Sequence, residues 1–407
     1  MLYRLELENF YSVRDQQVID VTVAPNVPDD EDRFGPIFTG ATDRAPKVLV
    51  LYGPNASGKT TILRALEFVA IFIRDSAQTN GPGFPCQRFN DDECSNRPIR
   101  LAVEFGGTMD LSEVVVERAE HGLDVEHGLY RYELELNVVD GTPVSVRLEA
   151  LRQKPLGKGK WQRVFERIEG DVQGSKTFAI SGYRHLLNTL KPNVSVISSF
   201  AQFGHPTAEL FADVARTVYS NIGRQVLGDE GILNIFRQSS DLINRVTRDL
   251  NRIDVGIEGM RFVDTPTGPL AMFKHSGLTL EMPWQLQSDG TRSFIRAFPY
   301  LALALERGGV AILDEFDTMI HAVVLPDILR WFYDKQVRNQ EDAQAWISVH
   351  SASLLDDLVK EQVILCEKDA LGRTHVFSLM DVKAVRRDEN LYKKYLSGAF
   401  GALPHIG

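Results

Sequence analysis

The sequence predicts an α/β fold in which a parallel-sheet core carries an antiparallel β layer and a helical insertion. Three observations predict the core and the β layer, and the helical period of residues 182–252 predicts the insertion. A glycine-rich motif at residues 53–60 lies between an apolar strand pattern and a helical pattern. A second apolar run, at residues 309–315, ends in two carboxylates. Between residues 99 and 171 the pattern changes to short alternating segments separated by turn residues, which is typical of an antiparallel sheet.

The glycine-rich motif fits G-x-x-x-x-G-K-[ST], the pattern of a phosphate-binding P-loop. It consists of Gly53, Pro54, Asn55, Ala56, Ser57, Gly58, Lys59 and Thr60. The apolar run 47–52 predicts the strand before it, and residues 61–69 predict the helix after it, which adds Thr61 to the site. Glycines let backbone N–H groups face phosphates, the helix N-terminus adds positive potential, Lys59 reaches the outer phosphates and Thr60 can hold Mg²⁺. We therefore predict a nucleotide-binding site.

Length and composition limit the class of protein. At 407 residues the chain exceeds the usual size of a single-core domain, so a main domain with an insertion is expected. A net charge of −10 argues against a generally basic nucleic-acid binder but leaves room for a local basic patch. Cys86, Cys94 and Cys366 form neither a disulfide framework nor a metal-ligand pattern. There is no long apolar segment, and the first residues alternate like a strand, so we expect a cytoplasmic protein without membrane contact.

The first half of the chain reads mainly as strands. Around a turn, strands are predicted at residues 2–7 and 17–23, and loops at 25–45 and 78–98. The antiparallel layer is predicted from the segments 100–105, 130–136, 144–149 and 161–167. One hairpin of this layer carries the basic residues Arg152, Lys154, Lys158, Lys160 and Arg163. A solvated rim is the favoured interpretation of this group, and contact with a phosphate backbone is the alternative.

Residues 182–252 follow a helical period, most clearly at 208–219 and 232–250, and are polar enough for a small exposed subdomain. No heptad array of several turns runs through them, which disfavours a long coiled-coil arm. Strand patterns then resume at 253–257 and 278–282. We therefore expect three parts: 1–181 and 253–407 as the halves of the core, and 182–252 as a helical insertion.

Two further strand ends complete the predicted site. The run 309–313, followed by Asp314 and Glu315, is what a Walker B element looks like. Asp314 would hold Mg²⁺ through water, and Glu315 would orient or deprotonate the attacking water. The segment 345–350 predicts another core strand, ending in His350. A lone histidine is more often structural, but at the carboxyl end of a neighbouring parallel strand His350 would point into the same crevice as Lys59.

A Ser-x-Gly element, at residues 287–291, precedes a predicted helix at 292–307 that leads into the Asp-Glu strand. Serine and glycine at a helix start can serve as a cap alone. In the order P-loop, Ser-x-Gly helix, Asp-Glu and His, however, the chain resembles the ATP-binding-cassette (ABC) ATPases and their SMC and DNA-repair relatives. The resemblance implies an ABC/SMC-like P-loop NTPase core in which Ser288 and Gly290 bind the γ-phosphate held by the other protomer.

The resemblance extends to one branch of stand-alone bacterial AAA-type ATPases with ABC-like sites, found in abortive-infection and restriction-linked operons. This is the RloA-like and AbiLii-like group, with OLD-family relatives. The likeness rests on residues 5–10, 287–292, 314–317, 367–369 and 395–404. It implies that Asp317 touches the opposite protomer. Where the family often has Leu-His-Pro, this chain has Ile320-His321-Ala322, so His350 is preferred to His321. For the glutamine that links Mg²⁺ to the helical subdomain, Gln202 is preferred to Gln87.

The resemblance implies an ATPase, with ATP and Mg²⁺ as cofactors, whose two protomers sandwich two ATP molecules and separate after hydrolysis. It further implies a sensor in anti-phage defence that controls a separate toxic effector; a higher oligomer and contact with nucleic acid stay open. The alternative is an SMC-type DNA-maintenance ATPase, which needs a coiled-coil arm and usually a basic surface. A transporter subunit fits the insertions poorly. A Toprim-type nuclease domain does not fit into the roughly forty residues after 367–369.

Overall fold

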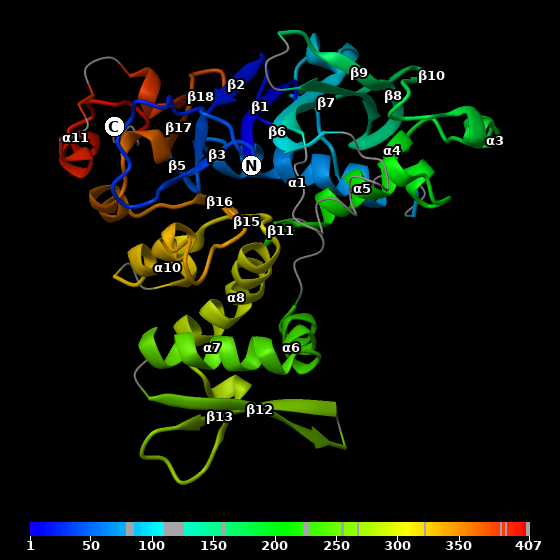
Figure 1. Ribbon diagram of the computed structural model, residues 1–407. Coiled ribbons are helices and arrows are strands. Elements are labelled where there is room, and N and C mark those ends of the chain that lie inside the picture. Colours follow the sequence, from blue (N-terminus) through cyan, green and yellow to red (C-terminus); the bar gives the residue numbers. More distant parts are fainter. Residues whose placement is uncertain are drawn as a thin grey trace.

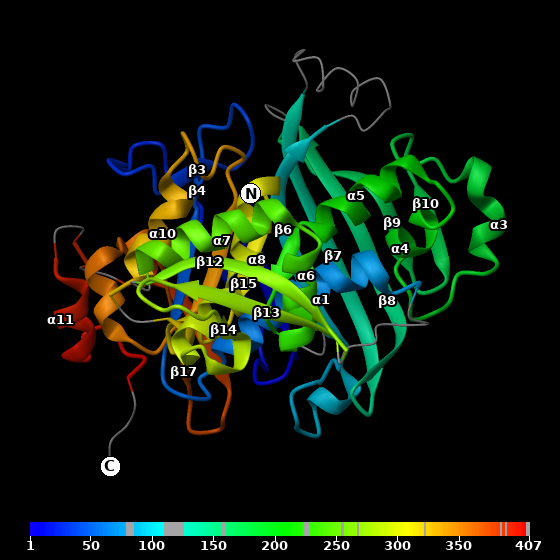
Figure 2. The ribbon, with the colours of Figure 1, turned by 90° about the horizontal axis from the view of Figure 1, so that it is seen from below.

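The computed structural model describes residues 1–78, 85–109, 126–155, 159–222, 228–253, 256–266, 268–320, 323–382, 385–386 and 389–403. Two sheets and the helices packed on them form the upper part of the molecule in Figure 1. A smaller lobe of helices and strands lies below them. Figure 2 shows the same molecule from the side of this lobe, with its strands crossing in front of the upper layers.

The central sheet has the strand order β11-β15-β16-β5-β17-β18. Its strands are β11 (Val218–Ser220), β15 (Val310–Leu313), β16 (Gln344–Ser348), β5 (Val48–Tyr52), β17 (Val363–Lys368) and β18 (Thr374–Ser378). All neighbouring strands are parallel except β17 and β18. Every residue of β5 and β16 is buried, because helices or the second sheet cover both faces. The three predicted core strands are confirmed, and their carboxyl ends meet at one edge of the sheet.

The second sheet is antiparallel and has the order β10-β9-β8-β7-β6-β1-β2. Its strands are β1 (Leu2–Glu8), β2 (Gln17–Asp20), β6 (Ile99–Thr108), β7 (His127–Val139), β8 (Thr142–Pro155), β9 (Gln162–Ile168) and β10 (Asp171–Gly174). Helix α1 (Lys59–Asp75) lies between the two sheets, and its Leu63, Leu66 and Phe72 join a buried cluster to which both sheets contribute. The predicted antiparallel layer is therefore confirmed, and its inner face holds α1 in place.

Helices cover the other face of the central sheet. They are α8 (Asp289–Arg307), α9 (Phe316–Met319) and α10 (Leu325–Tyr333). Leu301 of α8 and Ile328 of α10 belong to a second buried cluster, together with Val50 and Ile347 of the sheet. The helix predicted at 292–307 is confirmed and begins three residues earlier. Near the end of the described chain, α11 (Leu391–Leu396) packs beside β5, where the ring centroids of Tyr395 and Tyr52 are 5.8 Å apart.

The range 182–252 does not form one helical unit. Its elements are α3 (Arg184–Leu187), α4 (Val196–Ala201), α5 (Pro206–Arg216), β11, α6 (Asp229–Arg237) and α7 (Ser240–Ile253). Phe200 of α4 and Phe211 of α5 are buried in the same cluster as α1, so these helices belong to the upper layers. Helices α6 and α7 instead enter the lobe, where they join β12 (Ile257–Thr265), β13 (Gly268–His275) and β14 (Met282–Pro283). The lobe thus combines the helices α6 and α7 with three strands that follow residue 252.

Three further predictions differ from the structure in detail. The helix expected at 232–250 is interrupted, because the Ser239 hydroxyl accepts a hydrogen bond from the N–H of Leu242 and starts α7 anew. Of the strand expected at 278–282 only Met282 is in a strand, while Leu278 and Leu280 are exposed in the preceding loop. The loop predicted at 25–45 carries a small hairpin, which consists of β3 (Phe34–Pro36) and β4 (Arg44–Pro46).

Two described arginines of the basic hairpin form contacts within the antiparallel sheet. Arg152 forms ion pairs with Glu133 at 3.1 Å and Glu166 at 2.5 Å, and Arg163 donates to Gln173. These contacts favour the solvated rim over contact with a phosphate backbone. Lys158 lies outside the described residues. Across the described part of the chain, no helix combines the length and the apolar character needed to cross a membrane.

Candidate nucleotide-binding site

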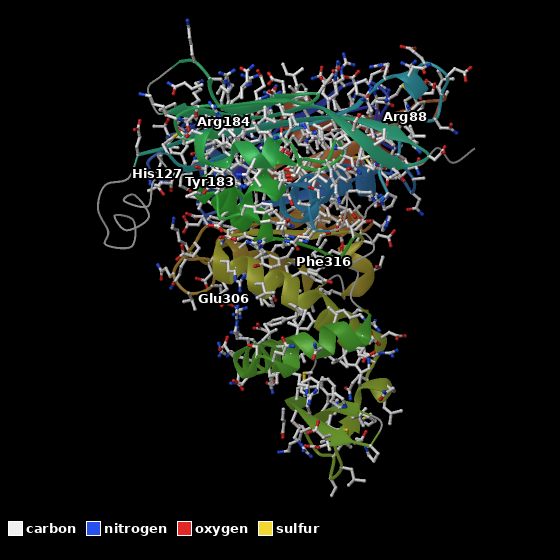
Figure 3. The ribbon with its side chains drawn as sticks, turned by 90° about the vertical axis from the view of Figure 1, so that its right-hand side faces the viewer. Arg88, His127, Tyr183, Arg184, Glu306 and Phe316 are labelled. Carbon is white, nitrogen blue, oxygen red and sulfur yellow. The ribbon has the colours of Figure 1, made fainter. Side chains whose placement is uncertain are left out.

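A cavity of about 1270 Å³ lies at the carboxyl end of the central sheet. The P-loop lines it, and Asp314, Glu315 and His350 reach it from the ends of β15 and β16. Arg88, at the edge of the upper layers in Figure 3, is among the residues that line it from the side of the antiparallel sheet. Pockets of about 300–1000 Å³ hold drug-sized ligands. The space is therefore sufficient for a nucleoside triphosphate.

Two glycines of the P-loop fit where no side chain could. Gly53 has a φ of 151°, and a Cβ added to it would lie 2.1 Å from the backbone oxygen of Cys366 in β17. Gly58 has a φ of 108°, and its Cβ would lie 2.4 Å from Oγ1 of Thr374 in β18. Thr374 also donates a hydrogen bond to the Ser57 carbonyl at 2.9 Å. The loop is thus pressed against β17 and β18, which sets its path before α1 begins.

Lys59 is held inside the loop that it serves. Its side chain is 6% exposed, and Nζ donates to the carbonyl oxygens of Gly53 at 2.8 Å and Pro54 at 3.1 Å. Burial lowers the pKa of the Lys59 ammonium, while nearby groups, which include Asp314 and Glu315, act in the opposite direction. The Lys59 ammonium therefore lies at the start of α1. Its N–H groups donate to loop carbonyls, and the phosphate oxygens of a nucleotide could accept these hydrogen bonds instead.

The residues around Thr60 fit a magnesium ion that arrives with a nucleotide. Thr60 Oγ1 donates to one carboxylate oxygen of Asp314 at 2.7 Å, and Ser348 Oγ donates to the other at 2.5 Å. Ser57 Oγ is buried in the P-loop with no hydrogen-bond partner among the described residues. Hydroxyl and carboxylate oxygens are hard donors of the kind that Mg²⁺ prefers, and phosphates and water usually complete its shell. Thr60 and Asp314 would therefore hold the ion.

Glu315 and His350 face each other at the cavity. Nε2 of His350 lies 3.6 Å from Oε1 of Glu315. Glu315 has a φ of 50°, a left-handed backbone conformation that is uncommon for a residue other than glycine. The backbone N–H groups of His350 and Ser351 donate to Asp317 Oδ2 at 2.8 and 2.5 Å. Asp317 thus positions the His350 loop within its own chain, and its contact with another protomer stays a prediction.

Residues 48–356 match the family described as "AAA domain, putative AbiEii toxin, Type IV TA system", which is more than half of the chain. The chain belongs to this family. The match runs from β5 to just beyond β16, so this AAA domain contains Lys59, Thr60, Asp314, Glu315 and His350. The buttressing strands β17 and β18 lie outside the match. No curated protein matches the chain.

Ser288 and Gly290 belong to the AAA domain but not to its cavity. Ser288 caps α8, because its Oγ accepts a hydrogen bond from the N–H of Thr291 at 3.1 Å. Both Ser288 and Gly290 are exposed. The first N–H groups of a helix have no partner within it, so the start of α8 presents a serine and a positive helix end away from the chain's own P-loop.

Gln202 is not brought to the cavity. It follows α4, in which Ser198 Oγ donates to the carbonyl of Arg74 at 3.2 Å, near the end of α1 opposite the P-loop. The sequence favours Gln202 because it lies where the predicted sheet segment gives way to helices, but α4 packs in the upper layers against α1. Gln87, the alternative, lines the cavity. His321 lies outside the described residues.

Sequence reasoning missed three residues that support the site of this AAA domain, namely Ser348, Thr374 and Asn221. For Ser348 a signal was available, since it is the polar residue in the apolar strand that leads to His350. Thr374 lies in β18, which the strand predictions omitted. Asn221 follows β11, which has only three residues and falls at the end of a predicted helix. Periodicity cannot detect a strand of this length.

Proposed function

We propose that the chain is a Mg²⁺-dependent ATPase whose active site is completed by a second copy of the chain. One observation carries the proposal. The P-loop, Asp314, Glu315 and His350 line one cavity, whereas Ser288 at the start of α8 is exposed and outside it. Such a cavity can bind the phosphates from one side. Its other side would stay open to solvent until a second copy contributes the N-terminus of its α8.

The chemistry would be hydrolysis of the terminal phosphate bond. The oxygen of water attacks the γ-phosphorus, and the bond to the β,γ-bridging oxygen breaks. Lys59 and the N-terminus of α1 would neutralise phosphate charge, and Thr60 and Asp314 would hold a Mg²⁺ ion, which would supply further charge neutralisation. Glu315 orients the water or takes its proton, and His350 contacts Glu315 from the neighbouring strand end.

The second copy would contribute the exposed start of α8. In this arrangement Ser288 and the helix N-terminus of one protomer contact the γ-phosphate bound by Lys59 of its partner. Two such contacts related by a two-fold axis give a closed dimer with two sites. Loss of the γ-phosphate removes the contact, so hydrolysis favours separation.

The proposal is tested with the Glu315→Gln variant, which keeps the shape of the side chain but removes the carboxylate. Turnover should fall by about 100-fold or more. The variant should retain ATP and sediment as a dimer when ATP and Mg²⁺ are present, and as a monomer without nucleotide. Lys59→Ala serves as the control and should stay monomeric with ATP. A Glu315→Gln chain that binds ATP yet stays monomeric at all concentrations would contradict the proposal.

We further propose that this ATPase controls a separate effector in anti-phage defence. The family description, which names a toxin and a toxin–antitoxin system, supports a role of this class. The carboxylates near the C-terminus are engaged structurally, since Glu367 accepts from the Ala402 N–H and Asp369 binds Arg373. If the purified chain cleaved DNA or RNA without a partner, the separate effector would be the wrong interpretation. The SMC-type alternative lacks support, because the longest helix among the described residues, α8, has 19 residues.

A further inference from the structure

The side chain of Asn221 is bonded to the backbone of Asp314 from the edge of the central sheet. Strand β11 pairs in parallel with β15, and the Asn221 N–H continues this ladder by donating to Ile312 O at 3.1 Å. The carboxamide then bonds Asp314 twice. Its Oδ1 accepts from the Asp314 N–H at 2.8 Å, and its Nδ2 donates to the Asp314 carbonyl at 3.1 Å. The side chain thus continues the hydrogen-bond ladder between β11 and β15 by two further bonds.

These bonds fix the peptide group between Asp314 and Glu315. Asn221 holds its carbonyl, and Ser348 Oγ accepts from its N–H at 2.8 Å. A peptide group held at both polar atoms cannot rotate, and its orientation sets the φ of Glu315, which is 50°. Such a conformation is strained for a residue other than glycine and persists only where the surroundings determine it. The backbone conformation therefore depends on Asn221 and Ser348, and it decides where the Glu315 carboxylate points.

Asn221 lies where the chain leaves the central sheet for the lobe. After β11 the chain leaves the central sheet for α6 of the lobe, and it returns through α8 into β15. At the return point the Val310 N–H donates to the Thr217 carbonyl at 2.9 Å, and a Cβ on Gly309 would lie 2.1 Å from that same oxygen. The outgoing and returning strands are thus joined at both ends. Asn221 lies where the connection to the lobe meets the carboxylates of the site.

We infer that Asn221 is a positioning residue that sets the orientation of Glu315 for the attack of water on ATP. The inference rests on the proposed ATPase function. Asn221 does not line the cavity, so it acts through the peptide group of Asp314 and Glu315. A carboxylate displaced by about 1 Å can lose about 100-fold in rate without any change in substrate binding.

The test is a comparison of turnover and binding in Asn221→Asp. Aspartate has the shape of asparagine and keeps the acceptor for the Asp314 N–H, but it places an oxygen against the Asp314 carbonyl. We expect kcat to fall by about 10-fold or more, while the Kd for ATP stays within about 3-fold of the wild type. Asn221→Ala, which removes both side-chain bonds without adding charge, should show the same split and serves if the aspartate variant does not fold. Asn137→Asp makes the same change at an exposed amide of β7 and should leave both values unchanged.

Two results would overturn the inference. One is a kcat equal to that of the wild type in both Asn221 variants. The other is a parallel loss of kcat, ATP affinity and melting temperature, because this would show a residue that only stabilises the fold. A wild-type chain that does not hydrolyse ATP in the same assay would contradict the proposed function instead, so the two failures can be told apart.

Discussion

At the scale of single residues, the site is organised by buried and half-buried polar groups that already have partners. Lys59 is bonded to two carbonyls of its own loop, and Asp314 to two hydroxyls. A nucleotide and its ion would replace these partners without large movements of the side chains. These side chains are therefore already oriented before a ligand binds, as catalysis by preorganised electrostatics requires.

One buried acid on α1 predicts a dependence of stability on pH. Glu67 is 6% exposed, and burial raises its pKa to about 7, although Ser220 and nearby arginines act in the opposite direction. The folded chain therefore binds this proton more tightly than the unfolded chain. Proton binding by Glu67 therefore stabilises the folded chain. This contribution to the free energy of unfolding is complete below about pH 4.5 and is lost as the pH rises through about 7, a loss on the order of 3 kcal/mol.

Glu67→Gln should remove this loss, because glutamine stays neutral. In urea unfolding at several pH values, the variant should gain stability relative to the wild type between about pH 5 and pH 8. Glu209→Gln, at an exposed position of α5, reports the effect of removing a carboxylate elsewhere. Parallel stability curves for Glu67→Gln and the wild type would show that Glu67 ionises freely in the folded chain.

At the scale of elements, two ion pairs among the described residues join α7 of the lobe to the upper layers. Arg245 of α7 reaches Glu306 of α8 at 3.1 Å, and Glu306 extends toward the lobe in Figure 3. Asp249 of α7, 5% exposed, is bonded by both terminal nitrogens of Arg338, at 2.6 and 3.2 Å. The Arg338 guanidinium also lies over the ring of Trp331, 4.4 Å from its centroid. The second contact is the better shielded from water.

Removal of Arg338 should be costly, because it leaves the Asp249 carboxylate buried without its partner. We expect Arg338→Met to lower the free energy of unfolding by about 3–5 kcal/mol. The double variant with Asp249→Asn should lose less than the sum of the single variants, since no buried charge remains. Arg330→Met, on the exposed face of α10, should stay within about 0.5 kcal/mol of the wild type. Additive losses in this cycle would show that the two residues stabilise the fold independently.

Elements with a strong period and clear boundaries could be predicted from the sequence. The P-loop strand and helix, α8 with its Ser288 cap, and the strands before Asp314 and His350 are all present. Short elements could not, because their place depends on contacts distant in sequence. Strand β11 forms only by pairing with β15, about ninety residues later. For the same reason the sequence indicated the side chains of the site but not Asn221, whose role exists only through that pairing.

At the scale of the whole molecule, the two halves of the proposed ATP site lie in different parts of the chain. The P-loop cavity is formed between the central sheet and the antiparallel sheet, while the start of α8 lies on the side of the lobe (Figure 1). The P-loop motif alone predicts only nucleotide binding. The exposed Ser288 supports the proposed dimer, and the family description supports the proposed role in defence.

Mixing two inactive variants tests whether each ATP site is shared between two copies of the chain. Lys59→Ala inactivates the P-loop half of the proposed ATP site, and Ser288→Arg inactivates the half that α8 contributes. A mixed dimer keeps one site in which both halves are intact. Equal amounts should therefore regain turnover well above that of either variant alone, because only a mixed dimer has a site in which Lys59 and Ser288 are both intact. A mixture no more active than the variants measured separately would contradict the shared site.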